Sequence, residues 1–516
     1  MTLGGIISKI LGAVYRIPLT NLLGTFAMGL YQLVFPLYGL LVMAGMGFSV
    51  AVSKAVAKER QLNQCAQCKE ILSCALLLSG AVGLVLSAIL YLFAYPIAHL
   101  QGNALIGEAY RILAPSVLVV CLSGALRGYF QGQMKMFPSA VSQIAEQLFK
   151  LVLGLIFAYR ALPDEIQAVN GAILAVTLSE IVALAVFVLY YFVERAPRVE
   201  LGQNPLYCKT SNGNLTPKRI TSQLLKTALP VLFGGILAPL SQLIDSSLML
   251  KFLSGDATRL YGVWSGPVHS LFTMPVMLSI GISSAILPSV SGKVAIGNMQ
   301  EVDKKINLAL KLNTVIVLPC VIGFIFFSVP IIKLLYGSLS MEDILLSAKL
   351  LSVVGVGSLF MCYAGTLSSV LQGVGKEYYS LLFTALAMVA KTAINVIFLP
   401  SDKVGVFAIA FSTILCYFVS VALSVGFLQR KIGIKFDFWS VFGKPLIAGT
   451  FLAIPLFLSN LLAKNFIDSR IGSLAVIGIS GVIYIMAVVG LKIFDGLLHA
   501  LKLKLHNRGK NKCKTL

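Results

Sequence analysis

Charged residues are scarce in this chain of 516 residues, and acidic residues are the scarcest of them. Charged residues make up 12% of the sequence, with 20 Asp and Glu against 41 Lys and Arg, whereas a soluble domain has about 25%. Hydrophobic residues make up 58%, and the mean hydropathy is +0.90. This composition excludes a soluble globular domain and predicts an all-α integral membrane protein.

Paired cysteine motifs are also missing. The nine cysteines are scattered, and the one close pair, Cys65 and Cys68, lacks the second pair that a structural zinc site needs. We therefore expect ordinary reduced thiols and no metal.

Apolar runs of about 20 residues, the length that crosses a bilayer, occur throughout the chain. They are not the 10-residue alternating segments of a β-barrel. The first run carries Lys9 and Arg16 and continues into further spans, so no cleavable signal peptide is expected. The predicted 14 helices lie at 4–26, 30–52, 70–95, 109–131, 138–160, 170–193, 226–251, 264–290, 307–328, 348–371, 379–399, 405–428, 445–463 and 472–493.

The basic residues alternate from loop to loop. If the N-terminus is cytoplasmic, the inside segments hold 26 of the 41 Lys and Arg residues and the outside loops hold nine. This asymmetry predicts that both termini are cytoplasmic. It also accounts for the net charge of +21 without a nucleic-acid partner.

Two segments 241 positions apart, 124–157 and 365–398, align without a gap. They share a Gln-Gly pair, a lysine three residues after it, and a second lysine (Lys150, Lys391) inside the next apolar run. The repeat predicts two six-helix lobes of the same orientation, with substrate bound between them. The predicted parts are an N-terminal lobe 1–193, a cytoplasmic linker 194–225, a C-terminal lobe 226–428, helices 13–14 at 429–493 and a basic tail 494–516 that lies along the inner leaflet.

Four motifs carry a family resemblance. They are SKILGAVYRIPLTNLLG at 8–24, GLYQLVFPLYGLLVMAGMGFSVAVSKAVA at 29–57, ISSAILPSVSGKVAIGN at 282–298 and LQG-x-GK at 371–376. The chain resembles the multidrug/oligosaccharidyl-lipid/polysaccharide (MOP) exporter superfamily, and within it the SpoVB and MurJ-type lipid-linked oligosaccharide flippases.

The resemblance implies a V-shaped protein of 14 helices in the bacterial cytoplasmic membrane. It would flip an undecaprenyl-diphosphate-linked saccharide by alternating access, with lipid II or a related cell-wall, spore-cortex or polysaccharide precursor as cargo. MurJ proteins of Gram-negative bacteria carry a charged residue early in helix 2 and an arginine in helix 8. This chain has the uncharged stretch 27–30 and the pair His269-Ser270 at those places, which favours the SpoVB-like branch.

A lipid diphosphate needs cations along its path through the membrane. Arg16 is the strongest candidate for binding it, with an interhelical ion pair or snorkelling as alternatives. Lys9 lies nearer the cytoplasmic end, where snorkelling and cavity lining are equally expected. Lys150 and Lys391 would form a twofold-related clamp, unless Lys150 pairs with Glu146 four residues earlier on its own helix. Lys391 has Ala387 at that position, so it has no such neighbour.

The acids inside spans are Glu146, Glu180 and Asp245. Each could pair with a cation of the path or carry a coupled proton or Na⁺. Asp245 is the choice for coupling or for the counter-ion of Arg16, and Glu146 is the second candidate. A buried acid that only bonds Ser or Gln neighbours is the alternative.

Helices 2 and 8 carry candidate hinges and one further polar residue. His269 is a candidate sugar or phosphate contact, or else an interfacial histidine with its bonds satisfied. Arg127, next to the loop that bears Gln131 and Gly132, would act at a cytoplasmic gate or as an interface residue. Pro36 and Pro267 would mark bending points for rocking, with close helix packing by the nearby glycines as the alternative.

Two other functions compete with the flippase. A cation-coupled multidrug exporter of the same superfamily would be expected to have twelve helices and clear acidic sites. A membrane glycosyltransferase or polymerase would need a catalytic carboxylate on a sizeable outside loop, and the outside acids here form no cluster in sequence. The expectation is therefore a monomeric transporter without a cofactor, in contact with membrane lipids. Coupling to the membrane potential, H⁺ or Na⁺ is left open.

Overall fold

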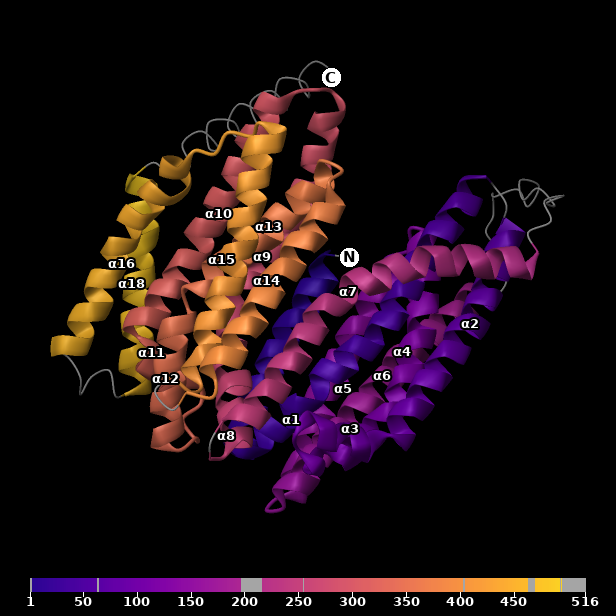
Figure 1. The fold of residues 1–516 in the computed structure, drawn as a ribbon, viewed down its shortest axis with the longest axis horizontal. Helices are drawn as coiled ribbons and strands as arrows, with labels where there is room; N and C mark the ends of the chain where they lie inside the picture. Colours follow the sequence, from indigo (N-terminus) through magenta and orange to yellow (C-terminus); the bar gives the residue numbers. More distant parts are fainter. Residues whose placement is uncertain are drawn as a thin grey trace, which may run out of the picture. The chain divides into compact units, whose positions relative to one another are not determined.

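Every regular element in the described part of the chain is a helix, which confirms the all-α fold (Figure 1). The structure, a computed structural model, describes residues 2–62, 65–195, 216–253, 255–401, 404–462, 469–491 and 493. The predicted tail 494–516 lies outside the described residues. So does the predicted linker from 196 to 215, and its last residues begin a helix at Pro217.

The first helix, α1 (Thr2–Gln61), joins the first two predicted spans without a loop. Its 60 residues would extend about 90 Å at 1.5 Å per residue, three times the hydrocarbon thickness. The helix breaks at Gly24, where φ is +76° and ψ is −179°, a conformation that glycine adopts without steric cost. Pro36 lies inside the second helical half of α1, 12 residues after the break at Gly24.

The remaining helices follow the predicted runs closely. Residues 257–295 form one interrupted span, in which the π-helical turn η3 (Trp264–Val268) separates α8 from α9. The helices after α1 are α2 (Cys65–Leu92), α3 (Ala94–Gln101), η1 (Ala104–Ile106), α4 (Gly107–Gly132), α5 (Phe137–Ala161), α6 (Glu165–Arg195), α7 (Pro217–Phe252), α8 (Ala257–Val263), η3, α9 (His269–Ala295), α10 (Met299–Phe326), α11 (Ser328–Leu335), α12 (Met341–Val354), α13 (Gly357–Gly373), α14 (Glu377–Phe398), α15 (Phe407–Phe427), η4 (Leu428–Ile432), η5 (Trp439–Gly443), α16 (Lys444–Leu462) and α18 (Arg470–Gly490).

The number of spans agrees with the prediction. Among the described residues, 12 helices are long and apolar enough to cross a membrane, and 13 if the pair α12 and α13, bent by 47°, forms one span. The first of these helices runs from Ile10 to Gln61 and contains the break at Gly24. When its two halves are counted separately, the described residues supply the 14 expected crossings.

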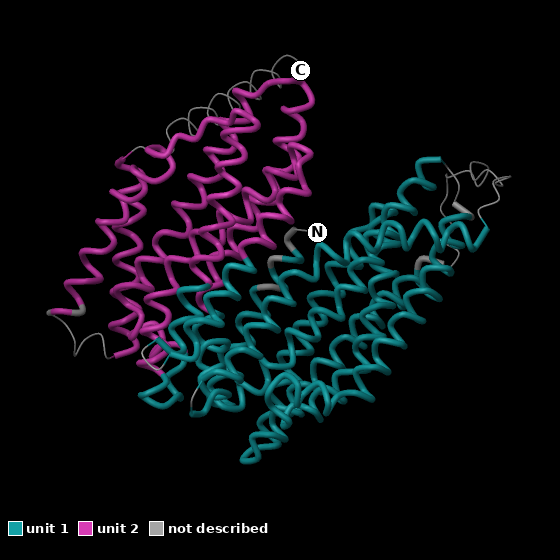
Figure 2. Tube along the Cα trace, in the orientation of Figure 1, with its two compact units in different colours: residues 1–270, 336–343, 388–412 teal, residues 271–335, 344–387, 413–516 magenta. Residues whose placement is uncertain are grey.

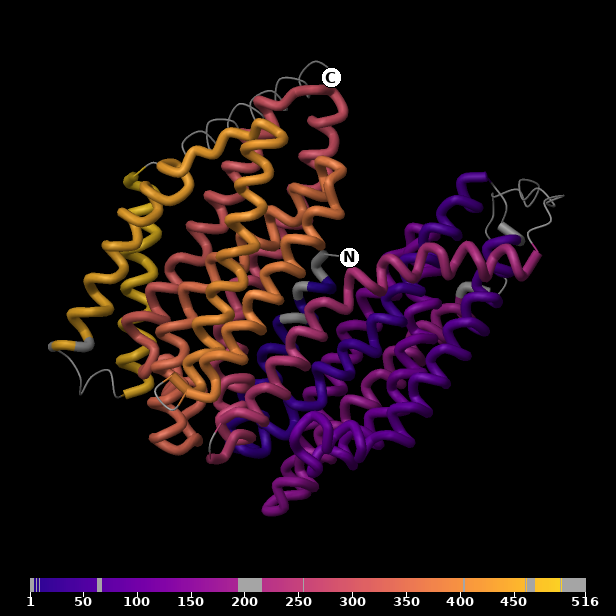
Figure 3. Tube along the Cα trace, in the orientation of Figure 1, coloured from indigo at the N-terminus to yellow at the C-terminus, as the bar shows by residue number. Residues whose placement is uncertain are grey.

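The chain divides into two compact units (Figure 2). Unit 1 comprises residues 1–270, 336–343 and 388–412, and unit 2 comprises 271–335, 344–387 and 413–516. Figure 3 follows the chain through both units by sequence colour. The boundaries of the two predicted six-helix lobes stay a prediction.

In unit 1, α1 packs against α4, α5 and α7, while α5 packs against α6. Helices α1 and α4 approach very closely, because a Cβ placed on Gly124 would lie 2.2 Å from the Gly45 carbonyl oxygen. A Cβ on Gly132, in the repeated Gln-Gly pair, would lie 2.8 Å from the Ser53 oxygen. In unit 2, a Cβ on the equivalent Gly373 would lie 3.1 Å from the Leu287 oxygen. The repeated glycines therefore allow close helix packing.

In unit 2, α10 packs against α13 and α16, and α16 packs against α18. The predicted helices 13 and 14 correspond to α16 and α18. They share an apolar cluster with α10, built around Leu318, Ala448, Leu452 and Tyr484. The Tyr484 hydroxyl donates to the Val315 carbonyl oxygen at 2.9 Å.

Candidate functional site

Several of the predicted cations lie close together in the interior of unit 1. The charge of Arg16, on α1, acts on Lys150 of α5 and on His269, the first residue of α9. The charge of Lys391, on α14, acts on His269 as well. Four side chains that lie far apart in sequence thus share one electrostatic environment. We refer to Arg16, Lys150 and Lys391 as the cationic cluster, with His269 within reach of the charges of Arg16 and Lys391.

Lys391 is held by an acid from another helix. Its Nζ donates to Asp245 Oδ2 of α7, and Asn395 Nδ2 donates to Asp245 Oδ1 at 2.8 Å. The side chains of Lys391 and Asp245 are only 13% and 9% exposed. Both carboxylate oxygens are thus engaged. The acid considered as a counter-ion for Arg16 instead pairs with Lys391, the lysine that has Ala387 rather than an acid four residues earlier on its helix.

Lys150 has a different environment from its repeat equivalent. Its Nζ lies 5.1 Å from the centroid of the Phe35 ring, a cation–π contact. Among the described residues no ion pair within 4.0 Å involves Lys150, although the charge of Glu146 acts on it. The Glu146 carboxylate accepts instead from Gln147 Nε2 at 2.8 Å. The two repeat-equivalent lysines therefore differ: Lys391 is salt-bridged and Lys150 is not.

Arg16 lies among tyrosines. Its charge acts on Tyr31, Tyr261 and Tyr336 as well as on the cationic cluster. No ion pair within 4.0 Å involves Arg16 in the part of the chain that the structure describes. Arg16 and Lys150 are thus two partly buried cations with no acid in direct contact. The side chain of Lys9 lies outside the described residues, so its predicted role stays a prediction.

A second group of charges lies beside Lys150. Tyr38 donates its hydroxyl proton to Glu180 Oε1 at 3.1 Å. The charges of Lys150 and Arg127 act on both Glu180 and Glu146. The Arg127 guanidinium carbon lies 5.8 Å from the centroid of the Phe187 ring. Two acids and two cations from α4, α5 and α6 thus lie within electrostatic reach of one another in unit 1.

The predicted hinge at Pro267 coincides with an irregular turn. Pro267 is inside η3, and His269 follows directly as the first residue of α9. A proline removes a backbone donor and clashes with the preceding turn, which favours such an irregularity. Its role in gating, like those of Pro36 and Arg127, stays a prediction.

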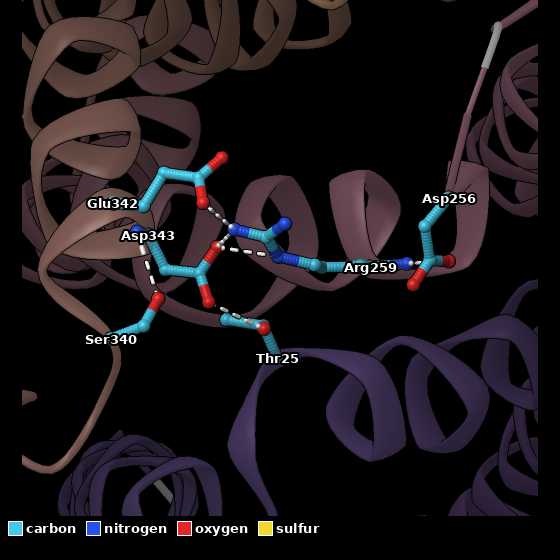
Figure 4. A network of polar contacts seen from close by, with 6 residues as sticks. All are labelled: Thr25, Asp256, Arg259, Ser340, Glu342 and Asp343. Carbon is cyan, nitrogen blue, oxygen red and sulfur yellow. Dashed lines mark hydrogen bonds and ion pairs between the residues drawn. The ribbon is translucent and has the colours of Figure 1, made fainter.

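A polar network that the sequence did not reveal lies within unit 1 (Figure 4). Arg259 of α8 donates Nε to Asp343 Oδ1 at 2.9 Å, and its Nη2 lies 2.8 Å from the same oxygen and 3.0 Å from Glu342 Oε2. Thr25 Oγ1 donates to Asp343 Oδ2 at 2.8 Å. The Asp343 N–H donates to Ser340 Oγ, and the Arg259 N–H donates to Asp256 Oδ1. The sequence shows these acids only as scattered loop residues, without a spacing that would join them.

Known proteins resemble the chain along most of its length. It is 27% identical to the lipid II flippase MurJ of Bacillus subtilis (strain 168), over 77% of this chain and 75% of that protein. It is 25% identical to stage V sporulation protein B of the same organism, over 80% and 78%. Its fold matches the inward closed conformation of a lipid II flippase MurJ with a TM-score of 0.74 at 16% identity, over 96% and 99%. These matches confirm the expected resemblance.

Two family sequence models match as well. The model described as MatE matches residues 230–397. The model described as polysaccharide biosynthesis protein matches residues 1–292, which is more than half of the chain. The chain therefore belongs to the polysaccharide biosynthesis protein family.

Proposed function

We propose that this chain is a flippase that moves an undecaprenyl-diphosphate-linked saccharide across the cytoplasmic membrane. The observation that carries the proposal is that Arg16 and Lys150 lie inside membrane spans and contact no acid directly in the described part of the chain. Intramembrane cations are costly and usually serve a substrate path. The similarity to a lipid II flippase and a sporulation protein supports the same cargo class. Flippases are transporters, so the proposal agrees with the exclusion of an enzyme.

The proposed binding mode follows from the cations. A diphosphate carries about two negative charges, which Arg16 meets with a planar, bidentate guanidinium and Lys150 with a point charge. His269 is a further contact. Lys391 contributes only if phosphate replaces Asp245 as its partner, because the ion pair already occupies its ammonium.

Energy coupling remains part of the proposal. Asp245 is engaged by Lys391 and Asn395, so it offers no free carboxylate oxygen to a coupling ion. Glu146 and Glu180 are then the intramembrane acids for an H⁺ or Na⁺, with the membrane potential as the third source. We further propose a monomer with both termini in the cytoplasm, as the basic loops favour.

Translocation in proteoliposomes tests the function. Purified protein would be given fluorescent lipid II or a simpler undecaprenyl-diphosphate monosaccharide, and quenching from outside would measure transfer. We expect transfer of at least one lipid, and loss of most of it in Arg16→Ala and in Lys150→Ala. Lys304→Ala, on a side chain that is 74% exposed, is the control for loss of a positive charge. No transfer of either lipid by the wild-type protein would refute the flippase.

Multidrug export is the second candidate, favoured by the MatE sequence match at residues 230–397. The same liposomes loaded with a fluorescent cationic dye distinguish the two functions. Dye efflux driven by an imposed H⁺ or Na⁺ gradient, without lipid transfer, would establish the exporter instead.

A further inference from the structure

The network around Arg259 joins three segments that the charge distribution places on the outside. Thr25 follows the break in α1, Arg259 lies on α8, and Asp343 lies in the first turn of α12. The segment 336–343, which runs from the residue after α11 into the first turn of α12, belongs to unit 1, although the residues before and after it belong to unit 2. It is therefore a short strap that is docked on α1 and α8.

The two acids that contact Arg259 differ in burial, and therefore in how much each contributes to the network. The Asp343 side chain is 6% exposed and accepts from both Arg259 and Thr25, so its charge is compensated inside the protein. Glu342 is 78% exposed and contributes little, as exposed ion pairs generally do. Removing one partner of a buried charge pair is costly, because the remaining charge loses its compensation. Asp343 is thus the centre of the network.

The two helices on which the strap is docked, α1 and α8, pack closely against each other. A Cβ on Gly262 of α8 would lie 1.7 Å from the Thr25 carbonyl oxygen, and a Cβ on Gly29 would lie 2.2 Å from the Thr258 oxygen. A second anchor ties the strap to α1, because Ser338 Oγ donates to the Asn21 carbonyl oxygen at 2.7 Å. The strap therefore holds both sides of the Gly24 break.

We propose that the Arg259–Asp343–Thr25 network is a latch that keeps the outside end of the transport path closed. The proposal rests on the proposed function, in which cargo must leave at that end. While Asp343 bridges Arg259 and Thr25, the strap fixes the break in α1. Release of the latch frees α1 at Gly24 and opens the transport path between Arg16 and the outside.

Accessibility of a buried reporter tests the latch without any substrate. Thr20 is fully buried on α1, between Arg16 and the break. In Thr20→Cys protein, labelling by a membrane-impermeant maleimide from the outside would be slow. We expect labelling at least about tenfold faster in Arg259→Ala and Asp343→Asn, since tenfold corresponds to only 1.4 kcal/mol. The chain that retains Thr20 gives the background from the native cysteines.

Matched variants separate the latch from general loosening. Glu342→Gln removes the exposed partner and should change the rate less than Asp343→Asn does. Glu301→Gln, in an exposed pair with Lys304, should leave it unchanged. Should Asp343→Asn fail to accumulate, Thr25→Val, of similar volume, supplies the measurement. Unchanged labelling in the latch variants, or equal acceleration by Glu301→Gln, would overturn the latch. The labelling assay needs no cargo, so its outcome does not depend on the outcome of the flippase assay.

Discussion

At the residue scale, the two repeated lysines acquired different partners. Lys391 is salt-bridged to Asp245, whereas Lys150 faces the Phe35 ring and has no ion pair in the described part of the chain. On sequence alone, Lys150 has an acid four residues earlier in Glu146, and Lys391 has Ala387 at that position. The structure reverses that order, because α7 supplies an acid from 146 positions away. Under the proposed function, we therefore expect Lys150 rather than Lys391 to meet an anionic ligand.

The Asp245–Lys391 pair should behave as a coupled unit. We expect Lys391→Ala to destabilise the protein by about 3 to 5 kcal/mol, because it leaves a buried carboxylate unpaired. The double variant Lys391→Ala/Asp245→Asn should recover most of that loss. Thermal unfolding in detergent, followed by tryptophan fluorescence, measures both. Additive losses in the double variant would contradict the coupling.

Lys150 should show the opposite behaviour. Its removal breaks no ion pair, so we expect Lys150→Ala to change the unfolding temperature little while weakening binding of an undecaprenyl-diphosphate ligand by tenfold or more, about 1.4 kcal/mol. Lys150→Arg, which keeps the charge, should retain part of the affinity. Binding titrations next to thermal unfolding make the comparison. A large loss of stability with unchanged affinity would assign Lys150 to the fold alone.

At the element scale, glycines decide where helices approach and where they break. Gly24 breaks α1 through its positive φ, and Gly262 and Gly29 bring α8 against the residues beside that break. The predicted bending point Pro36 lies inside helical backbone, and its role in rocking stays a prediction. A transmembrane helix tolerates a proline when its surroundings satisfy the freed carbonyl. The positive-φ glycine, by contrast, changes the direction of the backbone itself.

Close packing at Gly262 gives a direct prediction. Gly262→Ala would place a methyl group 1.7 Å from the Thr25 oxygen, so we expect a loss of stability of about 1 to 3 kcal/mol or more from overpacking. Gly281→Ala, on α9 with nothing within 4 Å of the new Cβ, is the control. It should be neutral or stabilising by up to about 1 kcal/mol, since alanine is the better helix former. Equal unfolding temperatures of the two variants would refute the close approach.

At the scale of the whole molecule, charge and contacts agree on which loops share a side. The positive-inside rule places Thr25, Arg259 and Asp343 outside, and the structure joins their side chains in one network. Segments assigned to the inside also meet, since Asn307 Nδ2 donates to the Lys435 carbonyl oxygen at 2.7 Å. This agreement supports the proposed topology.

Labelling of single cysteines in intact cells tests that topology. Leu100→Cys and Met341→Cys lie in segments placed outside, at positions 85% and 56% exposed. They should react with an impermeant maleimide. Met134→Cys and Ile296→Cys, at positions 77% and 69% exposed, should react only after the cells are opened. The reverse pattern would invert the orientation of the transporter and move the latch to the cytoplasmic side.

The sequence by itself determined the membrane class, the helix count, the predicted orientation and the family resemblance. These properties follow from local patterns, namely apolar runs of about 20 residues and the uneven distribution of Lys and Arg between loops. Only the tertiary structure decided that Asp245 engages Lys391 and that Asp343 joins Arg259 to Thr25. These ion pairs and hydrogen bonds join residues that are 84 to 318 positions apart in sequence. Their formation depends on helix rotation and packing, which no single segment encodes.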